Sequence, residues 1–307
     1  MKKYLKNYLF SKFPVISYNY LLIREFLRGF ENIRNNFFSV HGYHMNLKNP
    51  SSFSEKVHWK KIFDRDPLLV QFSDKVRVRD YVRQRLGDQE ANKIFVPLLH
   101  ISDDPSDIPF EKLPDKYIIK PNHMSGQKIM VDTNSYSEEQ IITICKSWLK
   151  KPYNLYSLEW GYQPIKRKIL IQPVILNSSG NIPDEYRFFC FNGNVKLVQA
   201  DSPGVDGNTL FDRDGNELEV YHSMKYEVPV KITDGFTKMI EIAEVLSKTR
   251  DFIRVDFMSG DNLIYFNEIT SYPRSGCKKF DPMEYDFELG KSWSLDRSHA
   301  SFLSKFI

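Results

Sequence analysis

Residues 251–276, DFIRVDFMSGDNLIYFNEITSYPRSG, decide how the rest of the chain is interpreted. They predict two strands, Phe252–Phe257 and Leu263–Thr270, because both runs are rich in aromatic and β-branched residues. A short polar turn that contains Gly260 and Asp261 separates the two runs. The stretch therefore predicts a β-hairpin.

The hairpin carries acidic and basic side chains where a core strand would be apolar. The strand period of two puts Arg254 and Asp256 on one face of the first strand, and Phe266, Glu268 and Thr270 on one face of the second. If Arg254 lies opposite Glu268, Asp256 lies diagonally from Glu268, with roughly 7–8 Å between the backbones. Two such carboxylates can share a divalent cation, and hard oxygen ligands favour magnesium. The alternative is an Arg254–Glu268 cross-strand pair with Asp256 left over, and the pattern alone leaves both open.

Length and composition are those of a folded protein with more than one packed lobe. The chain has 307 residues, of which 41% are hydrophobic and 14% aromatic, so it can bury sizeable cores. Its formal net charge is +4 and its sequence pI is about 8.7. This mild excess of basic residues favours anionic ligands or surfaces but is too weak to predict nucleic-acid binding.

Two features predict a cytoplasmic protein. The three cysteines, Cys145, Cys190 and Cys277, lack metal-like spacing and suit a reducing compartment. The apolar runs fall short of the ~18 residues that a membrane span needs. Near the N-terminus they are interrupted by Ser11, Lys12 and Pro14, which argues against a secretory signal.

Residues 1–40 predict helical structure with two possible roles. Apolar residues near the helical period are Leu21, Leu22, Phe26 and Phe30, and the basic residues between them are Arg24, Arg28 and Arg34. Such a helix can lie on an anionic membrane surface as a peripheral contact. Packing against the body of the protein is the more common arrangement, and we favour it.

Further helices are predicted up to residue 90. The capping-box pattern Ser52–Glu55 starts a helix through about Phe63, and Asp66-Pro67 opens a short segment. Ser73 or Asp74 then caps a third helix. It is predicted at Lys75–Leu86, and Gly87 ends it. Since no strand alternates with these helices, the first 90 residues predict a helical cap.

Strands dominate the middle of the chain. The predicted strands are Ile94–Leu99, Lys116–Lys120, Lys128–Val131 and Lys168–Leu176, and Ser137–Lys150 is predicted as a helix with Ile141, Ile144, Cys145 and Trp148 inward. The loop at 121–126, PNHMSG, is small, polar and able to fold over phosphates with backbone N–H donors. Ordinary turn chemistry explains its Ser-Gly pair equally well. Pro173, inside the fourth strand, predicts an edge or a crossing between subdomains.

The remaining predictions follow from turn signals and periodicity. Asn192-Gly193 predicts a hairpin turn between Asp184–Phe191 and Asn194–Ala200. Residues 202–234 predict loops with short strands, and Phe236–Lys248 predicts a helix. The tail after Gly276 predicts irregular structure.

Five segments, in this order, resemble the ATP-grasp superfamily and match most closely its TupA-like branch, which is named from teichuronopeptide synthesis. They are SDKVRVRDYV, KYIIKPNHMSGQKIMV, KILIQPVIL, DEYRFFCFNGNVKLV and IRVDFMSGDNLIYFNEITSYPRSG, and they lie within residues 50–290. The resemblance implies an α+β ATP-grasp fold in which two α+β subdomains sandwich ATP. It divides the chain into an N-terminal helical region (1–90), a lid subdomain (91–172) and a catalytic subdomain (173–307).

The resemblance assigns the residues around the ATP phosphates. Lys75 and Lys120 match the two lysines that reach the phosphates, a role that suits a flexible point charge. Ser125 and Gly126 match the loop over the phosphates. His123 either joins this loop's contacts or makes only a local contact within it.

The resemblance also places the nucleoside. Gln172, Pro173 and Val174 match the hinge that holds adenine between the two lobes. The family commonly has an acidic residue where Gln172 stands, but glutamine keeps an acceptor oxygen for the adenine amino group. Glu185 matches the acidic residue that accepts hydrogen bonds from the ribose hydroxyls, and the adjacent Asp184 is the other candidate.

At the metal, the resemblance supports the magnesium interpretation of the hairpin. Arg254 matches an arginine that contacts phosphate, and Asp256 and Glu268 match two magnesium carboxylates. Thr270 stands where many ATP-grasp enzymes have an asparagine ligand, so we expect one metal position to be loose or filled by water. Arg187, on the Glu185 face of its strand, is expected to reach a phosphate or an anionic substrate.

The loop Tyr272–Gly276 leaves the second hairpin strand and is expected to lie at the mouth of the metal site. Proline and glycine would turn this loop and aim Arg274 inward, where its planar fork could orient a carboxylate substrate. A solvent-facing Arg274 in a surface turn is the alternative.

The function implied is an ATP- and Mg²⁺-dependent ligase that phosphorylates a carboxylate and joins it to an amine. By analogy with the TupA-like branch, the carboxylate belongs to a uronic acid or another unit of a bacterial surface polysaccharide or its precursor. Two alternatives remain: a transferase of surface-polymer assembly with a grasp-type nucleotide site, and a non-catalytic nucleotide-binding module. The expected partners are a small amine and a carboxylate-bearing sugar or polysaccharide, without nucleic acid.

Overall fold

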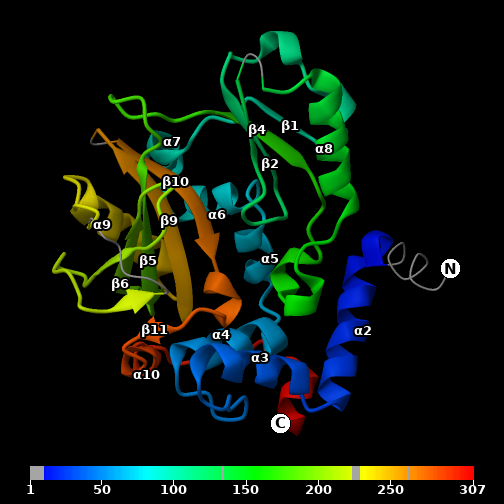
Figure 1. Cartoon of the computed structure of the whole chain (residues 1–307), viewed down its shortest axis with the longest axis vertical. Coiled ribbons are helices and arrows are strands. Elements are labelled where there is room, and N and C mark those ends of the chain that lie inside the picture. Colours follow the sequence, from blue (N-terminus) through cyan, green and yellow to red (C-terminus); the bar gives the residue numbers. More distant parts are fainter. Residues whose placement is uncertain (1–9, 133–134, 223–228, 262) are drawn as a thin grey trace.

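The computed structural model of the chain describes residues 10–132, 135–222, 229–261 and 263–307. Its two larger sheets are antiparallel, and in Figure 1 the one with β1, β2 and β4 lies at the top and the one with β5, β6, β9 and β10 on the left. The smaller has the strand order β1-β4-β2-β3 and the larger the order β10-β9-β5-β6-β7. Residues 1–9 of the predicted N-terminal helical region and 223–228 of the predicted loop region lie outside the described residues.

Six helices precede the first strand in the described part of the chain. They are α2 (Pro14–Leu27), α3 (Glu31–His41), α4 (Phe53–Phe63), α5 (Pro67–Ser73), α6 (Val78–Leu86) and α7 (Asp88–Ile94). The predicted capping box is confirmed, because the Ser52 side chain accepts from Glu55 N and the Glu55 carboxylate accepts from Ser52 N. Leu21, Leu22 and Phe30 are buried in one cluster with residues of α4, which confirms that α2 packs on the body of the protein.

Two boundaries in this region were predicted wrongly. The third helix begins at Val78 rather than Lys75, because the Asp74 carboxylate accepts from the amides of Val76 and Arg77 and holds a separate turn. Ile94–Leu99 is not a strand, since Ile94 ends α7. Periodicity cannot separate a short buried strand from the apolar end of a helix.

The four-stranded sheet is covered on one face by a helix. Its strands are β1 (His100–Ser102), β2 (Tyr117–Pro121), β3 (Ile129–Val131) and β4 (Ile169–Pro173), and α8 (Glu138–Lys150) packs on it. Ile141, Cys145 and Trp148 of α8 are buried in one core with Ile119 and Ile171 of the sheet, as predicted. The other face of this sheet carries Ile118, Lys120 and Gln172 by alternation.

The five-stranded sheet has an apolar face and a partly polar face. Its strands are β5 (Asp184–Phe191), β6 (Asn194–Asp201), β7 (Thr209–Phe211), β9 (Phe252–Gly260) and β10 (Leu263–Thr270). The apolar face packs against α9 (Phe236–Ser247) together with residues of α6 and α7. The predicted Asn192-Gly193 turn joins β5 to β6, with φ of 49° and 82° at these two residues.

The C-terminal tail is more regular than predicted. The short strands β8 (Tyr221–His222) and β11 (Phe280–Asp281) pair, and α10 (Glu284–Lys291) packs on α4. The close approach requires a glycine, because a Cβ at Gly290 would lie 2.2 Å from the Ser51 carbonyl oxygen. Two short helical turns complete this end, η5 (Pro273–Gly276) and η6 (Phe302–Phe306).

A β-bulge changes the register expected for the β9–β10 hairpin. Glu268 lies directly opposite Asp256, and Thr270 lies opposite Arg254. Phe266 pairs with Phe257 on the apolar face, so it does not share the face of Glu268 as alternation predicted. The extra residue in the bulge reverses the inside–outside pattern between Phe266 and Glu268, which strict alternation cannot detect.

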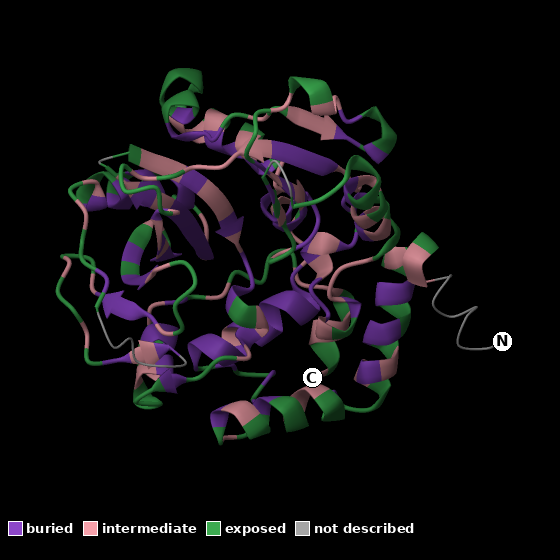
Figure 2. Ribbon diagram, turned by 45° about the horizontal axis from the view of Figure 1, so that its top comes forward, coloured by how far each residue is buried: buried purple, intermediate pink, exposed green. Residues whose placement is uncertain are grey.

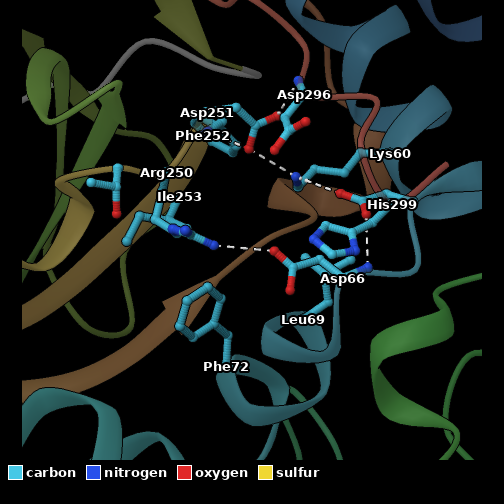
Figure 3. Close-up of a pocket in the computed structure, with 12 residues that line it drawn as sticks. Lys60, Asp66, Leu69, Phe72, Arg250, Asp251, Phe252, Ile253, Asp296 and His299 are labelled. Atoms are coloured by element: carbon cyan, nitrogen blue, oxygen red, sulfur yellow. Dashed lines mark hydrogen bonds and ion pairs between the residues drawn. The ribbon is translucent and has the colours of Figure 1, made fainter. Parts of the chain in front are cut away.

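A buried ionic cluster fastens the start of β9 to α4 (Figure 3). Lys60 Nζ lies 2.7 Å from Asp64 Oδ2 and 2.9 Å from Asp251 Oδ1. Burial opposes the charge of Lys60, but the two carboxylates outweigh it and raise the lysine's pKa. Arg250 adds an ion pair of 3.1 Å with Asp66. The space left among these groups is about 10 Å³, enough for one water molecule at most.

The described helices include none that combines the length and the apolar character needed to cross a bilayer.

Candidate active site

The candidate site is built on the partly polar face of the five-stranded sheet. Cross-strand pairing sets four polar side chains in one row across four strands. They are Glu268 (β10), Asp256 (β9), Arg187 (β5) and Gln199 (β6). The hairpin therefore brings the two predicted carboxylates closer than a diagonal pairing would.

Arg254 and Asp256 form a bidentate pair inside this row. Arg254 Nε and Nη2 donate to the two Asp256 carboxylate oxygens at 2.8 and 2.6 Å, and the two residues are 7% and 1% exposed. Arg254 Nη2 also donates to Thr270 Oγ1 at 3.2 Å. Burial opposes the guanidinium charge, but Asp256 outweighs it and raises the pKa of Arg254. Neither simple interpretation of the sequence included this Arg254–Asp256 pair.

Glu268 is the more accessible of the two carboxylates. Its side chain is 23% exposed and accepts a 3.2 Å hydrogen bond from Thr270 Oγ1. Two cations lie slightly farther away, Lys75 Nζ at 3.7 Å and Arg254 Nη2 at 3.9 Å. Burial would raise the pKa of Glu268, but the two cations outweigh it and hold the pKa below its usual value. Glu268 is thus ionised at neutral pH.

Arg187 joins the row to a second set of acids. Its guanidinium pairs with Glu185 and with Asp201, and its Nε lies 3.8 Å from Asp256 Oδ2. Glu185 faces the site, whereas its neighbour Asp184 lies on the other face and accepts from Ser202 Oγ at 2.5 Å. Of the two ribose candidates, only Glu185 lies on the face that carries the row.

Sequence reasoning missed the residues that hold Arg187 from β6. Gln199 Nε2 donates to both Asp201 carboxylate oxygens at 3.1 Å, and Gln199 Oε1 lies 3.0 Å from His222 Nδ1. Burial and the charges of Arg254 and Arg274 lower the pKa of His222 to about 3, so a neutral ring donates to the amide oxygen. The available signal was a polar pair, Gln199 and Asp201, on one face of a strand that is otherwise largely buried.

Lys120 approaches the row from the four-stranded sheet. It is half-buried on the face away from α8. Burial and the charges of Lys75 and Lys128 lower its pKa to about 8, against the opposing effect of Glu268 and Glu185. Lys120 is therefore close enough to both sheet acids for their charges to act on it.

Lys75 is held in place by a buried asparagine that the sequence did not single out. Asn122 is fully buried, donates from Nδ2 to Asp74 Oδ1 at 3.0 Å, and accepts from Lys168 N at 2.7 Å. The backbone amide of Lys75 donates to Asn122 O at 3.1 Å, and Lys75 Nζ donates to Met124 O at 2.6 Å. These bonds fix the loop after β2 against the turn that carries Lys75.

The other predicted nucleotide residues lie around this loop and strand. Ser125 is half-buried, and Gly126 is exposed with φ of 74°. His123 is 1% exposed, and its Nε2 lies 3.2 Å from Lys151 O at the end of α8, so its contact lies outside the loop. Gln172, Pro173 and Val174 are half-buried where the chain leaves β4 for the larger sheet.

The turn that carries Arg274 has an unusual backbone conformation, and side chains of α4 hold it in place. Arg274, Ser275 and Gly276 have φ of 49°, 58° and 69°. Lys61 Nζ donates to Ser275 O at 2.8 Å, and a Cβ at Gly276 would lie 2.5 Å from a ring nitrogen of His58. Such a left-handed run persists only where its surroundings impose it. Here the N-terminal helix α4 does so.

Arg274 is exposed, yet its charge reaches the site. Partial burial and the neighbouring charges of Arg187 and Arg254 lower its pKa, with Glu185 and Asp256 acting in the opposite direction. The turn therefore keeps a third guanidinium near the two arginines of the sheet. The sequence predicted either an inward-pointing or a solvent-facing Arg274. The observed position is intermediate, because Arg274 is neither buried nor remote from the row.

The donors at the row fit a hard divalent cation. Glu268 is accessible, Thr270 supplies a hydroxyl, and each Asp256 oxygen keeps a lone pair beyond its bond to Arg254. Within the described residues, no group of three or more His, Cys, Asp or Glu side chains could hold a metal. A magnesium ion here would depend on two carboxylates together with phosphate and water oxygens, which is its usual coordination.

The sequence matches the TupA-like ATPgrasp family over residues 55–294. Among curated proteins, none is significantly similar in sequence. Similar solved structures include the D-alanine–D-alanine ligase from Helicobacter pylori (14% identity, TM-score 0.45, covering 79% of this chain and 67% of that one).

Two further solved structures are similar at the same low level. One is the D-alanine–D-alanine ligase from Bacillus anthracis complexed with ATP (14% identity, TM-score 0.41, covering 73% of this chain and 65% of that one). The other is the L-amino acid ligase from Bacillus licheniformis (13% identity, TM-score 0.36, covering 66% and 40%). This chain thus spans about two thirds of the length of the D-alanine–D-alanine ligases. On the match over most of its length, the chain belongs to the TupA-like ATP-grasp family.

Proposed function

We propose that the protein is an ATP- and Mg²⁺-dependent ligase that joins a carboxylate to an amine through an acyl phosphate. The observation that supports it most strongly is the meeting of Lys75 and Lys120 with Glu268 and the Arg254–Asp256 pair. Lys75 Nζ lies 3.7 Å from Glu268, and Arg254 pairs with Asp256 on the adjacent strand. The charge of Glu268 also acts on Lys120. Phosphoryl transfer needs mostly positioning and charge stabilisation, which this arrangement offers.

In this proposal the lysines, the arginine and the carboxylates have different tasks. Lys75 and Lys120 bind the phosphates of ATP, and Arg254 contacts the transferred phosphoryl group. Asp256 and Glu268 hold magnesium, and Thr270 orients Glu268 or supplies a weaker oxygen. The metal would neutralise charge on the phosphate oxygens.

In this proposal, the residues that the family resemblance assigns bind the nucleoside and the phosphates. Gln172, Pro173 and Val174 hold adenine where the chain passes between the two sheets. Glu185 accepts from the ribose hydroxyls. Ser125 and Gly126 offer backbone N–H groups to the phosphates, and His123 keeps the loop in place through its contact with Lys151 O.

The reaction requires no protein nucleophile. A substrate carboxylate oxygen attacks the γ-phosphorus and ADP leaves; the amine nitrogen then attacks the acyl carbon, phosphate leaves, and one N–H proton is lost. Arg274 binds the carboxylate before the first step, and Arg187 orients either phosphate or this anionic substrate. Three guanidiniums near one another suit an anion that changes its charge distribution during the reaction.

We further propose a uronic acid or another carboxylate of a bacterial surface polysaccharide, or of its precursor, as the substrate. Family membership supports this proposal by analogy. The amine would be an amino acid or another small amine.

Product analysis tests the reaction. The protein is incubated with Mg·ATP, a panel of uronic acids and a panel of amines, and products are identified by mass spectrometry. The ligase predicts ADP, phosphate and amide in equal amounts, each dependent on both substrates. A sugar or polyol transferred without phosphate release would instead indicate the transferase, and nucleotide binding without any product would indicate a binding module.

A further inference from the structure

Helix α2 carries a second apolar stripe on its exposed side. The stripe consists of Phe13 (43% exposed), Ile16 (67%), Tyr20 (55%), Ile23 (51%) and Leu27 (78%). With 3.6 residues per turn, the four positions from Ile16 to Leu27 fall within an arc of roughly 60°, and Phe13 lies just before the helix at its N-cap. Exposed apolar residues scattered singly need no explanation, but five in one continuous stripe do.

The opposite side of the helix is already used. Tyr18, Leu21 and Leu22 are at most 4% exposed and pack in the cluster formed by α2, α3 and α4. A helix that is apolar on both sides is normally buried on both sides. In Figure 1 and Figure 2 α2 stands at the edge of the molecule, and the exposure of the five side chains leaves the outer stripe available to a partner.

The charged residues around the stripe indicate the sign of the partner's charge. Lys12 and Arg28 are exposed, and Arg24 is half-buried. The first acidic residue of the chain is Glu25, which is 5% exposed and bound by Arg24 and Asn32 at 3.0 Å. The sequence before Lys12 adds three further lysines, Lys2, Lys3 and Lys6. An apolar stripe bordered by cations complements an anionic surface.

We infer that this stripe docks the protein on an anionic lipid surface. The helix would lie in the plane of the interface, with the five apolar side chains between the headgroups and the cations at the phosphates. A second copy of the chain fits less well, because pairing two stripes would bring their cations together. This inference concerns a face distinct from the candidate site and does not depend on the proposed reaction.

Vesicle co-sedimentation at low and physiological salt tests the inference. The probes are vesicles of phosphatidylcholine alone and of phosphatidylcholine with phosphatidylglycerol. The full chain should bind the anionic vesicles, with affinity at least tenfold higher than for neutral ones and falling as salt is raised. Ile23→Glu and Leu27→Glu each replace an exposed side chain, so the fold should survive, and each should weaken binding at least tenfold.

Val245→Glu is the matched control, because Val245 is 42% exposed on α9, on a different helix. It should bind anionic vesicles as the parent does, and all three variants should keep the parent's melting temperature. The inference would be overturned by no binding of the parent chain, by equal binding of the Ile23 and Leu27 variants, or by a concentration-dependent dimer that Ile23→Glu dissociates. Loss of binding on deleting residues 1–9, with the two stripe variants unaffected, would also overturn it in favour of those residues.

Discussion

Strand β9 contributes to two ionic clusters, one at its start around Asp251 and one at mid-strand around Asp256 and its β10 partner Glu268. The two clusters differ in how completely their charges are satisfied. At Asp251 the ion pairs are short, between 2.7 and 3.1 Å, and the space among them holds one water at most. Around Glu268, Lys75 Nζ and Arg254 Nη2 lie 3.7 and 3.9 Å from the carboxylate oxygens, and the carboxylate is partly exposed. We call the first the closed cluster (Lys60, Asp64 and Asp251) and the second the open cluster (Arg254, Asp256 and Glu268). A closed cluster fastens one element to another, whereas an open cluster can accept a ligand. The difference fits a structural role for the cluster at Asp251 and the proposed ligand-binding role for the cluster around Glu268.

Breaking the closed cluster should have the largest effect on stability. Lys60→Met leaves two buried carboxylates, Asp64 and Asp251, without their cation and should lower the free energy of unfolding by roughly 3–5 kcal/mol. Urea denaturation measures this change. Lys238→Met, which removes an exposed pair with Glu241, is the control and should cost roughly 0–1 kcal/mol. Equal losses of unfolding free energy in the two variants would mean that the closed cluster stabilises the protein no more than an exposed ion pair does.

Breaking the open cluster should instead affect turnover. Glu268→Gln keeps the shape but removes the negative charge offered to magnesium, so turnover should fall at least ~100-fold, or about 2.7 kcal/mol of barrier. The free energy of unfolding should change by no more than roughly 1 kcal/mol, since the cations are 3.7–3.9 Å away and the pair is partly exposed. Steady-state kinetics and denaturation are compared on the same preparation. Near-normal turnover with reduced stability would make Glu268 a structural partner of Arg254.

Replacing Arg274, the third guanidinium, should affect the carboxylate substrate at the edge of the open cluster. Arg274→Ala should raise KM for the carboxylate, or lower kcat, by roughly 10- to 100-fold, as expected for a charge-assisted hydrogen bond. The affinity for ATP should stay nearly constant, and Arg274→Lys should rescue only part of the loss because lysine lacks the planar fork. If ATP affinity falls equally, the residue belongs with the phosphates. Unchanged kinetics would place Arg274 in solvent.

Lys120 gives the open cluster a pH dependence. Its folded-state pKa, about 8, lies below the usual value, so the free protein loses this charge as pH rises through 8. Lys75 and Lys128 disfavour the charge, and Glu268 and Glu185 favour it. ATP affinity should therefore be nearly constant below about pH 7 and fall about tenfold between pH 7 and 9. Calorimetric titration across this range measures it.

Lys120→Arg is the control for this pH dependence, because arginine stays protonated. Its ATP affinity should be flat over the same range. The same linkage predicts that the ligand-free protein gains stability between pH 8 and the unfolded-state pKa, because the unfolded chain then binds more protons than the folded one. A flat pH profile in the parent chain would contradict the assignment of Lys120 to the phosphates.

Sequence patterns predicted the elements well and their exact relation less well. The capping box at Ser52, the Asn192-Gly193 turn and the inward face of α8 are local, and each was confirmed. The register of β9 and β10 was wrong, because one extra residue at the bulge reverses a face without changing composition. α10 was missed because its contact with α4 depends on close backbone approach at Gly290.

The candidate site shows the same division. Charged residues that break an apolar strand, such as Arg254, Asp256 and Glu268, are visible in the sequence. Residues that act through distant partners are not: Asn122 joins a loop to a turn 48 residues earlier, and Asp201 reaches Arg187 across a strand pair. Their roles depend on tertiary contacts that no local pattern encodes.

Nucleotide-dependent stabilisation tests the central claim most directly, namely that the open cluster binds Mg·ATP. At a hundredfold excess over Kd, binding should stabilise the parent chain by roughly 2.7 kcal/mol, which raises the melting temperature by several degrees. Lys120→Met should lose most of this shift, and Lys238→Met should keep it. The shift should also require magnesium. No shift in the parent chain with millimolar ATP and magnesium, or an equal shift in Lys120→Met, would contradict the account.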